Sequence, residues 1–70
     1  MSARNPLTIR LDEPAPTGEK VQNRRNPKRI GYVSMAPTWP QGCVTVDFDE
    51  GPSANVDAFN FCHEWKRVTP

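Results

Sequence analysis

The alternation of apolar and polar residues in residues 43–58 constrains the fold of this chain more than any other feature of its sequence. Val44, Val46 and Phe48 are each followed by a polar residue. A period of two places one set of side chains on a buried face and the other set in water. The pattern stops at residues 49–52, a run of turn-forming residues, and then resumes. We therefore expect a β-hairpin whose strands each present one apolar face. The second strand is expected to bury Ala54, Val56 and Ala58.

Length and composition divide the chain into two parts. Seventy residues provide one domain at most, and a chain of this size buries only about 60% of its unfolded surface. Residues 1–28 are polar and interrupted by prolines, so burial there does not offset an ordering cost of about 1–2 kcal/mol per residue. We predict a flexible basic arm at residues 1–28 and a folded domain at residues 29–70. Within the arm, residues 7–11 alternate and could add a strand to the sheet.

Two further segments have clear local patterns. Residues 29–35 are predicted to form a strand with Gly31, Val33 and Met35 on one face. Residues 36–42 contain two prolines, which cannot donate to a β-ladder, so we expect a loop there.

The C-terminal segment allows two interpretations. The favoured one is a tight turn around Asn60 that leads into a closing strand at Glu64–Val68. The alternative is a short helical turn with Asp57 as its N-cap, in which side chains three and four positions apart would meet. In both cases the core is expected to contain Phe59, Phe61 and Trp65.

The order of these motifs resembles a known group of small β proteins. It is carried by residues 30–33 (IGYV), residues 44–51 (VTVDFDEG), residues 55–56 (NV) and residues 65–68 (WKRV). Over residues 29–68 the chain resembles the Src-homology-3-like (SH3-like) small barrels, in particular the KOW and Tudor-like group. The resemblance implies an all-β barrel of about five short strands and a binding function. KOW modules attach to RNA or to transcription and translation machinery, and Tudor-like modules bind peptides or nucleic acid.

One enzyme is built on this type of barrel, the small plasmid-borne dihydrofolate reductase, whose pore strand carries a Val-Gln-Ile-Tyr motif. This chain has no such motif. It also has no glycine-rich phosphate loop and no identifiable nucleophile with an orienting group. We therefore expect a binding module and not an enzyme, with no cofactor.

Basic residues gather in the first part of the chain. Residues 1–30 carry a net charge of +4 and residues 31–70 a net charge of −3. The densest basic cluster is predicted to contact phosphates, unless it is only a solvated linker. An exposed tyrosine and a tryptophan between two prolines could stack on bases or position them. For the tryptophan, the alternative interpretation that it caps the barrel end is favoured, because a core this small needs every large side chain. The candidate nucleic-acid-binding residues are Arg24, Arg25, Lys28, Arg29, Tyr32, Trp39, Lys66 and Arg67.

Cys43, Cys62 and His63 are too few and too widely spaced for a structural zinc site. We expect two small buried thiols, which a strand pairing could bring together, and a surface histidine. The chain has no apolar run near 18 residues and no secretory signal pattern, so we expect a cytoplasmic protein without a membrane span.

The sequence thus favours an accessory or regulatory module that binds RNA or DNA. The alternative is a protein-interaction adaptor or inhibitor, such as mobile elements encode, that uses residues 7–11, the Trp39 loop and the acidic hairpin. Self-association as a homodimer through Ile30 or Tyr32 would favour that alternative.

Overall fold

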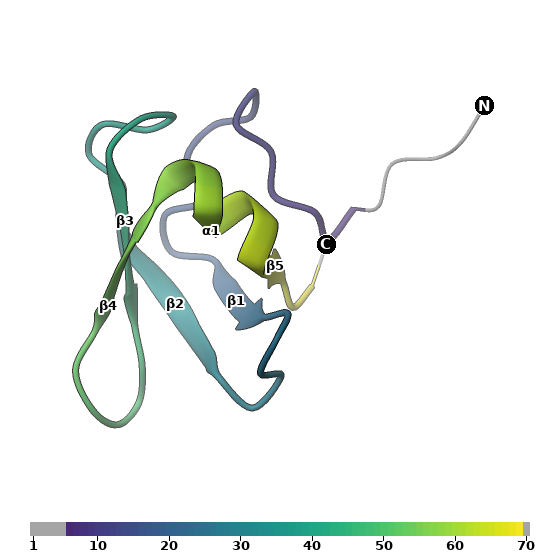
Figure 1. The fold of residues 1–70 in the computed structure, drawn as a ribbon, viewed down its shortest axis with the longest axis vertical. Helices are drawn as coiled ribbons and strands as arrows, with labels where there is room; N and C mark the ends of the chain where they lie inside the picture. Colours follow the sequence, from purple (N-terminus) through teal and green to yellow (C-terminus); the bar gives the residue numbers. More distant parts are fainter. Residues whose placement is uncertain (1–5, 70) are drawn as a thin grey trace.

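The computed structural model describes residues 6–69, and its main feature is one antiparallel β-sheet with a single short helix lying over one face (Figure 1). The strand order is β4-β3-β2-β1-β5. The sheet does not close, and α1 connects its two edge strands. The elements are β1 (Lys20–Asn23), β2 (Ile30–Met35), β3 (Cys43–Asp47), β4 (Ala54–Asp57), α1 (Ala58–Glu64) and β5 (Trp65–Arg67).

The predicted hairpin is confirmed as β3 and β4. Val44 pairs with Val56 and Val46 pairs with Ala54 across the two strands. Val44 and Val46 are fully buried, whereas Val56 on the edge strand is half-buried. Ala58 is buried as expected, but as the first residue of α1 and not as part of the strand.

The predicted strand at residues 29–35 is confirmed as β2, with one change of face. Gly31 and Val33 point inward as expected, but Met35 is exposed. The register between β2 and β3 shifts between Val33 and Met35, and such a bulge turns the following side chain to the other face. At Gly31 a Cβ atom would clash with the backbone oxygen of Asp47, so the close approach of the two strands requires glycine there.

The structure differs from the predicted division at residue 28. β1 lies inside the segment that composition assigned to a flexible arm, and Val21 in β1 is fully buried. Ile9 is buried in the same core, and the backbone N–H of Arg67 donates to the carbonyl of Leu7 at 2.8 Å. The predicted added strand at residues 7–11 is represented by one bridge, Thr8 with Lys66. The few apolar residues of this segment thus enter a core that the other strands build. Residues 1–5 lie outside the described part.

The favoured prediction for the C-terminal segment was wrong about the turn and correct about the closing strand. Residues 58–64 form α1, and the carboxylate of Asp57 accepts from the backbone N–H groups of Phe59 and Asn60 at 3.0 and 3.4 Å. β5 follows directly. Helical spacing places Phe61 and Trp65 on the buried side, while Phe59 is 59% exposed and was wrongly assigned to the core.

The core lies between the sheet on one side and α1 with the N-terminal segment on the other. The rings of Phe61 and Trp65 stack with their centroids 6.2 Å apart, and Phe48 packs against Trp65 at 6.0 Å. The opposite face of the sheet has no helix over it (Figure 1). Within the described residues, α1 is far too short to cross a membrane. The core consists of Ile9, Val21, Val33, Val44, Val46, Ala58, Phe61 and Trp65.

Candidate functional site

The turn between β1 and β2, residues 24–29, carries most of the predicted phosphate-binding residues and is internally ordered. The side-chain oxygen of Asn23 accepts from the backbone N–H groups of Arg25 and Asn26, both at 2.9 Å. The backbone N–H of Arg29 donates to Asn26, and that of Asn23 donates to Arg29, also at 2.9 Å. The amide of Gln22 donates to the carbonyl of Pro27 at 2.9 Å. These bonds order the backbone of the turn from which the basic side chains extend.

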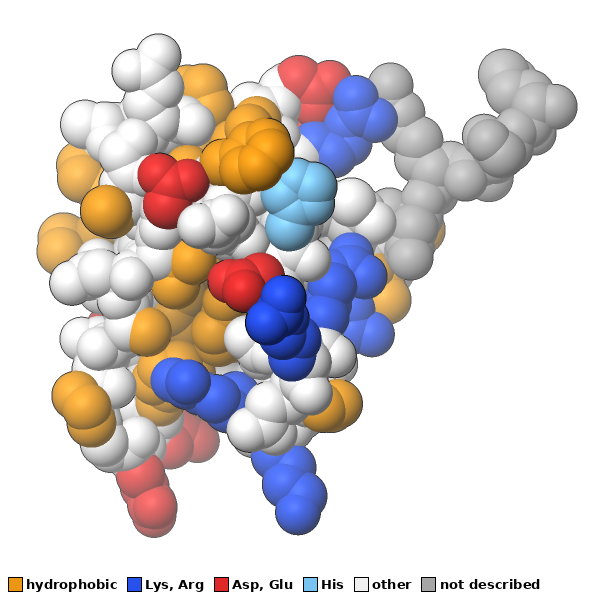
Figure 2. Space-filling view, in the orientation of Figure 1, with side chains coloured by type: hydrophobic (Ala, Val, Ile, Leu, Met, Phe, Trp, Pro, Cys, Tyr) orange, Lys and Arg blue, Asp and Glu red, His pale blue; other side chains and the backbone are white. Residues whose placement is uncertain are grey.

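The cations of this turn face solvent. Arg24, Arg25, Lys28 and Arg29 are exposed, and none of the four forms an ion pair with a carboxylate of the described residues. The guanidinium of Arg29 lies 4.6 Å from the centre of the Phe48 ring, which is a cation–π contact. Figure 2 shows basic and acidic side chains projecting at the lower end of the view, where the β1–β2 and β3–β4 turns lie. We call Arg24, Arg25 and Lys28 the basic turn.

A groove of about 500 Å³ separates the basic turn from the β3–β4 turn. Its two charged sides differ in sign, because cations come from the β1–β2 turn and carboxylates from the β3–β4 turn. Phe48 and Ile30 supply the apolar surface between them. The arrangement can accept a ligand that carries both an anionic group and a flat or apolar group. The groove is lined by Lys28, Arg29, Ile30, Phe48, Asp49, Glu50 and Pro52.

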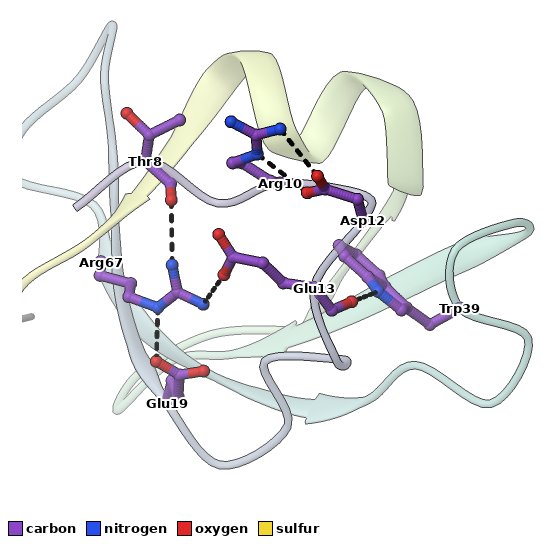
Figure 3. A network of polar contacts seen from close by, with 7 residues as sticks. All are labelled: Thr8, Arg10, Asp12, Glu13, Glu19, Trp39 and Arg67. Atoms are coloured by element: carbon purple, nitrogen blue, oxygen red, sulfur yellow. Dashed lines mark hydrogen bonds and ion pairs between the residues drawn. The ribbon is translucent and has the colours of Figure 1, made fainter. Parts of the chain in front are cut away.

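Arg67 is committed to the protein's own structure and is not a free cation (Figure 3). Its Nε donates to Glu19 at 2.7 Å, its Nη2 to Glu13 at 2.9 Å and its Nη1 to the carbonyl of Thr8 at 3.0 Å. The hydrogen bond to Glu19, followed by that to Glu13, raises the pKa of Arg67 above its ordinary value. Lys66, its neighbour in β5, lies opposite Gln22 on β1. The structure therefore does not bring Arg67 into the basic turn.

The two aromatic candidates also lie apart from the basic turn. Trp39, in the loop between β2 and β3, packs edge-on against Phe61 with ring centroids 6.5 Å apart. Its indole N–H donates to the carbonyl of Glu13 at 2.8 Å (Figure 3), so Trp39 covers the core as the alternative interpretation expected. Tyr32 is 47% exposed, on the face of the sheet opposite the core.

Sequence reasoning missed two parts of this region. The pairing of Arg67 with Glu13 and Glu19 joins residues 54 and 48 positions apart, and no local pattern indicates such a contact. Phe48 was assigned to the buried alternation, whereas its ring also lines the groove. The Asp-Glu-Gly turn that follows it was the available signal, because a turn there leaves the end of the strand partly exposed.

The thiols and the histidine do not form a site. Cys43 is exposed, which corrects the expected burial, and Cys62 is half-buried; neither is in a disulfide. Burial, together with the charge of Glu13, raises the pKa of the Cys62 thiol above its ordinary value. His63 is exposed and packs its ring 4.6 Å from that of Phe59. No group of three or more His, Cys, Asp or Glu residues within residues 6–69 is placed to hold a metal ion.

The chain was compared with known proteins at the levels of family, sequence and structure. No protein-family model, no curated protein and no solved structure matches it. Its function is therefore argued from the geometry of the basic turn and the groove.

Proposed function

We propose that this protein is a small nucleic-acid-binding module that holds phosphates with its basic turn. One observation carries the proposal: Arg24, Arg25 and Lys28 are exposed, have no ion-pair partner within residues 6–69, and project from a turn fixed by its own hydrogen bonds. A turn whose backbone is already ordered loses less backbone freedom when its cations bind a phosphate. Each phosphate neutralised also releases counterions, which favours binding.

We further propose that the fold is an SH3-like small barrel. The strand order supports this, since β5 returns to pair with β1, and the first and last strands commonly neighbour each other in barrels of that kind. The motifs that carry the sequence resemblance fall in β2, β3, β4 and β5.

The groove beside the basic turn favours a single strand over a duplex. A base that leaves its stack can lie against the guanidinium of Arg29, which itself covers the Phe48 ring, because guanidinium planes stack on bases. Asp49 and Glu50 on the far side of the groove can accept hydrogen bonds from exocyclic amino groups of bases. The same carboxylates repel a second phosphate backbone, so a duplex would fit less well.

The test is fluorescence anisotropy with labelled single-stranded DNA, single-stranded RNA and duplex DNA. Three phosphate contacts on a single strand predict a log–log salt slope of about −2, which is a loss of about 20-fold between ~50 and ~200 mM salt. Replacing Arg25 by Ala should reduce the magnitude of the slope by about 0.7. The triple variant Arg24→Ala, Arg25→Ala, Lys28→Ala should abolish binding. The matched control is Arg10→Ala, which removes a cation that already pairs with Asp12.

Two results would refute the proposal. One is the absence of binding to all three nucleic acids at the lower salt concentration. The other is a triple variant that binds as tightly as the unmodified protein while retaining its circular dichroism spectrum.

A protein-binding function is the second candidate, favoured by the acidic side of the groove. The structure uses the other two parts of the predicted adaptor surface internally, because Thr8 pairs with Lys66 and Trp39 packs on Phe61. Asp49 and Glu50 remain exposed and would meet a basic segment of a partner. Calorimetric titration with a short arginine-rich peptide tests this. The double variant Asp49→Asn, Glu50→Gln should abolish peptide binding but strengthen binding to nucleic acid.

A further inference from the structure

The face of the sheet opposite α1, which we call the outer face, places an apolar row between two rows of opposite charge. Tyr32 in β2 lies directly between Lys20 in β1 and Asp47 in β3. Residues paired across antiparallel strands project from the same face. Lys20, Tyr32 and Asp47 therefore form one line of side chains across the middle of the outer face.

The apolar row follows β2, the central strand of the five. Ile30 is 38% exposed, Tyr32 47% and Met35 57%. These three and Phe59 are the exposed large hydrophobic residues of the described part of the chain. No element of that part covers the row, and a continuous exposed apolar row of this kind indicates an interaction surface.

The charges on the two sides of β2 have opposite signs. β1 and β5 contribute Lys20 and Lys66 to the outer face and contain no acidic residue. β3 contributes Asp47, and neither β3 nor β4 contains a basic residue. Neither Lys20 nor Asp47 forms an ion pair with a described residue. The outer face is thus positive on one side of β2 and negative on the other.

We propose that a second copy of this chain docks on the outer face, related by a two-fold axis that runs parallel to β2 between the two sheets. This rotation places β2 on β2 and exchanges the two sides of the sheet. The positive half of each copy then faces the negative half of the other. Lys20 meets Asp47 of the partner subunit on both sides of the axis, with the two Tyr32 side chains packed between these pairs.

The charge pattern selects this arrangement over others. A two-fold axis perpendicular to the strands would place Lys20 on Lys20 and Asp47 on Asp47, which is unfavourable. A nucleic acid on the same face would be repelled by Asp47. The chosen arrangement is isologous, so one surface satisfies both copies, and it matches the aligned packing of face-to-face sheets.

The size of the outer face predicts a weak dimer. Five strands of three to six residues span far less than the ~800 Å² per partner of a standard interface. We therefore expect association that depends on protein concentration. The inference does not rest on the proposed function, because no residue of the basic turn belongs to the outer face, although Ile30 in the apolar row also lines the groove.

Sedimentation equilibrium over about 10 μM to 1 mM protein tests the inference. The unmodified chain should pass from monomer to dimer as its concentration rises. Lys20→Asp alone and Asp47→Lys alone should each raise the dimer dissociation constant about tenfold, because each puts like charges together at two symmetric positions. The combined variant Lys20→Asp, Asp47→Lys restores both pairs and should return the constant to within about threefold of the original.

The matched control is Asp49→Lys, which makes the same charge change in the β3–β4 turn, beyond the end of β3. It should leave the dissociation constant unchanged. Circular dichroism and thermal melting of every variant establish that it is folded, as expected for exposed positions. A chain that stays monomeric throughout, or single variants that dimerise like the unmodified chain, would overturn the inference. A combined variant as weak as the single ones would overturn the arrangement about β2.

Discussion

Replacing Arg67 by Met should destabilise the fold strongly although the residue lies near the C-terminus. Arg67 joins β5 to the N-terminal segment through Glu13, Glu19 and the carbonyl of Thr8 (Figure 3). Its side chain is only 12% exposed. Methionine can follow the path of the aliphatic stem but donates none of the three bonds. The substitution therefore removes the three side-chain hydrogen bonds of Arg67 to the N-terminal segment while keeping most of the packing.

The expected magnitude follows from the exposure of the two acceptors. A hydrogen bond to a charged group contributes about 1.5–3 kcal/mol when it is buried. The side chains of Glu13 and Glu19 are 32% and 41% exposed, so both recover water when Arg67 is lost and each bond contributes less. We expect a total loss of about 2–3 kcal/mol for the three bonds. A chain of this length has a stability of roughly 4–10 kcal/mol, so the melting temperature should fall by about 10–20 °C.

Thermal and urea denaturation, followed by circular dichroism, measure this loss. The stability of Arg67→Lys should lie between that of the unmodified chain and that of Arg67→Met, because an ammonium keeps the charge but cannot bond all three acceptors in the same geometry. Arg10→Met is the matched control, since it breaks the exposed pair with Asp12 and should leave the midpoint nearly unchanged. If Arg67→Met shifted the unfolding midpoint no more than Arg10→Met, the three hydrogen bonds of Arg67 would contribute nothing to stability and the reasoning would be refuted.

Four further predictions concern α1, β2 and the thiols. Asp57→Ala removes the helix N-cap and should lower the free energy of unfolding by about 1 kcal/mol in urea titrations; an unchanged value would show that the cap is not needed. Gly31→Ala would push a Cβ into the carbonyl of Asp47 and should cost about 1–3 kcal/mol by the same measurement, whereas a neutral result would mean that β2 and β3 separate easily. At neutral pH a disulfide reagent monitored by absorbance should modify exposed Cys43 well before Cys62, and equal rates would contradict the half-burial of Cys62. Folding raises the pKa of the Cys62 thiol, so the folded state disfavours the thiolate. The stability that the protonated thiol contributes is complete below about pH 8.5 and is lost as the pH rises through the raised pKa. Over that pH range Cys62→Ser should therefore lose less stability than the unmodified chain.

The sequence was sufficient for the elements whose signals are local. The alternation at Val44 and Val46 predicted β3 together with its buried face. The closing strand was also predicted, and Asp57 was recognised as the cap of the alternative helix. The favoured turn around Asn60 failed because the six residues between Asp57 and the predicted strand at Glu64–Val68 fit a turn and a short helix equally well in sequence.

Part of the candidate site was also predicted, because the signals that mark an exposed polar segment are local in the sequence. Two asparagines and one proline around Arg24, Arg25 and Lys28 mark a polar segment that cannot be buried, and the structure has these cations exposed on a turn. Whether a given cation is free depends on what lies near it in space. Arg67 cannot be distinguished from the other basic residues in the sequence, but in the structure it forms ion pairs with two carboxylates of the N-terminal segment.

Periodicity and turn chemistry act over a few residues, so the sequence by itself determined the β character, the central hairpin and the exposure of the basic turn. The tertiary structure alone decided that the N-terminal segment belongs to the fold. Ile9 and Val21 are too few to form a core by themselves, and they are buried only because Phe61, Trp65 and the other strands supply the surface that they cover. A contact between residues distant in sequence lowers the free energy only when the rest of the core is present to offset the entropy cost of closing the loop. No local sequence pattern indicates such a contact.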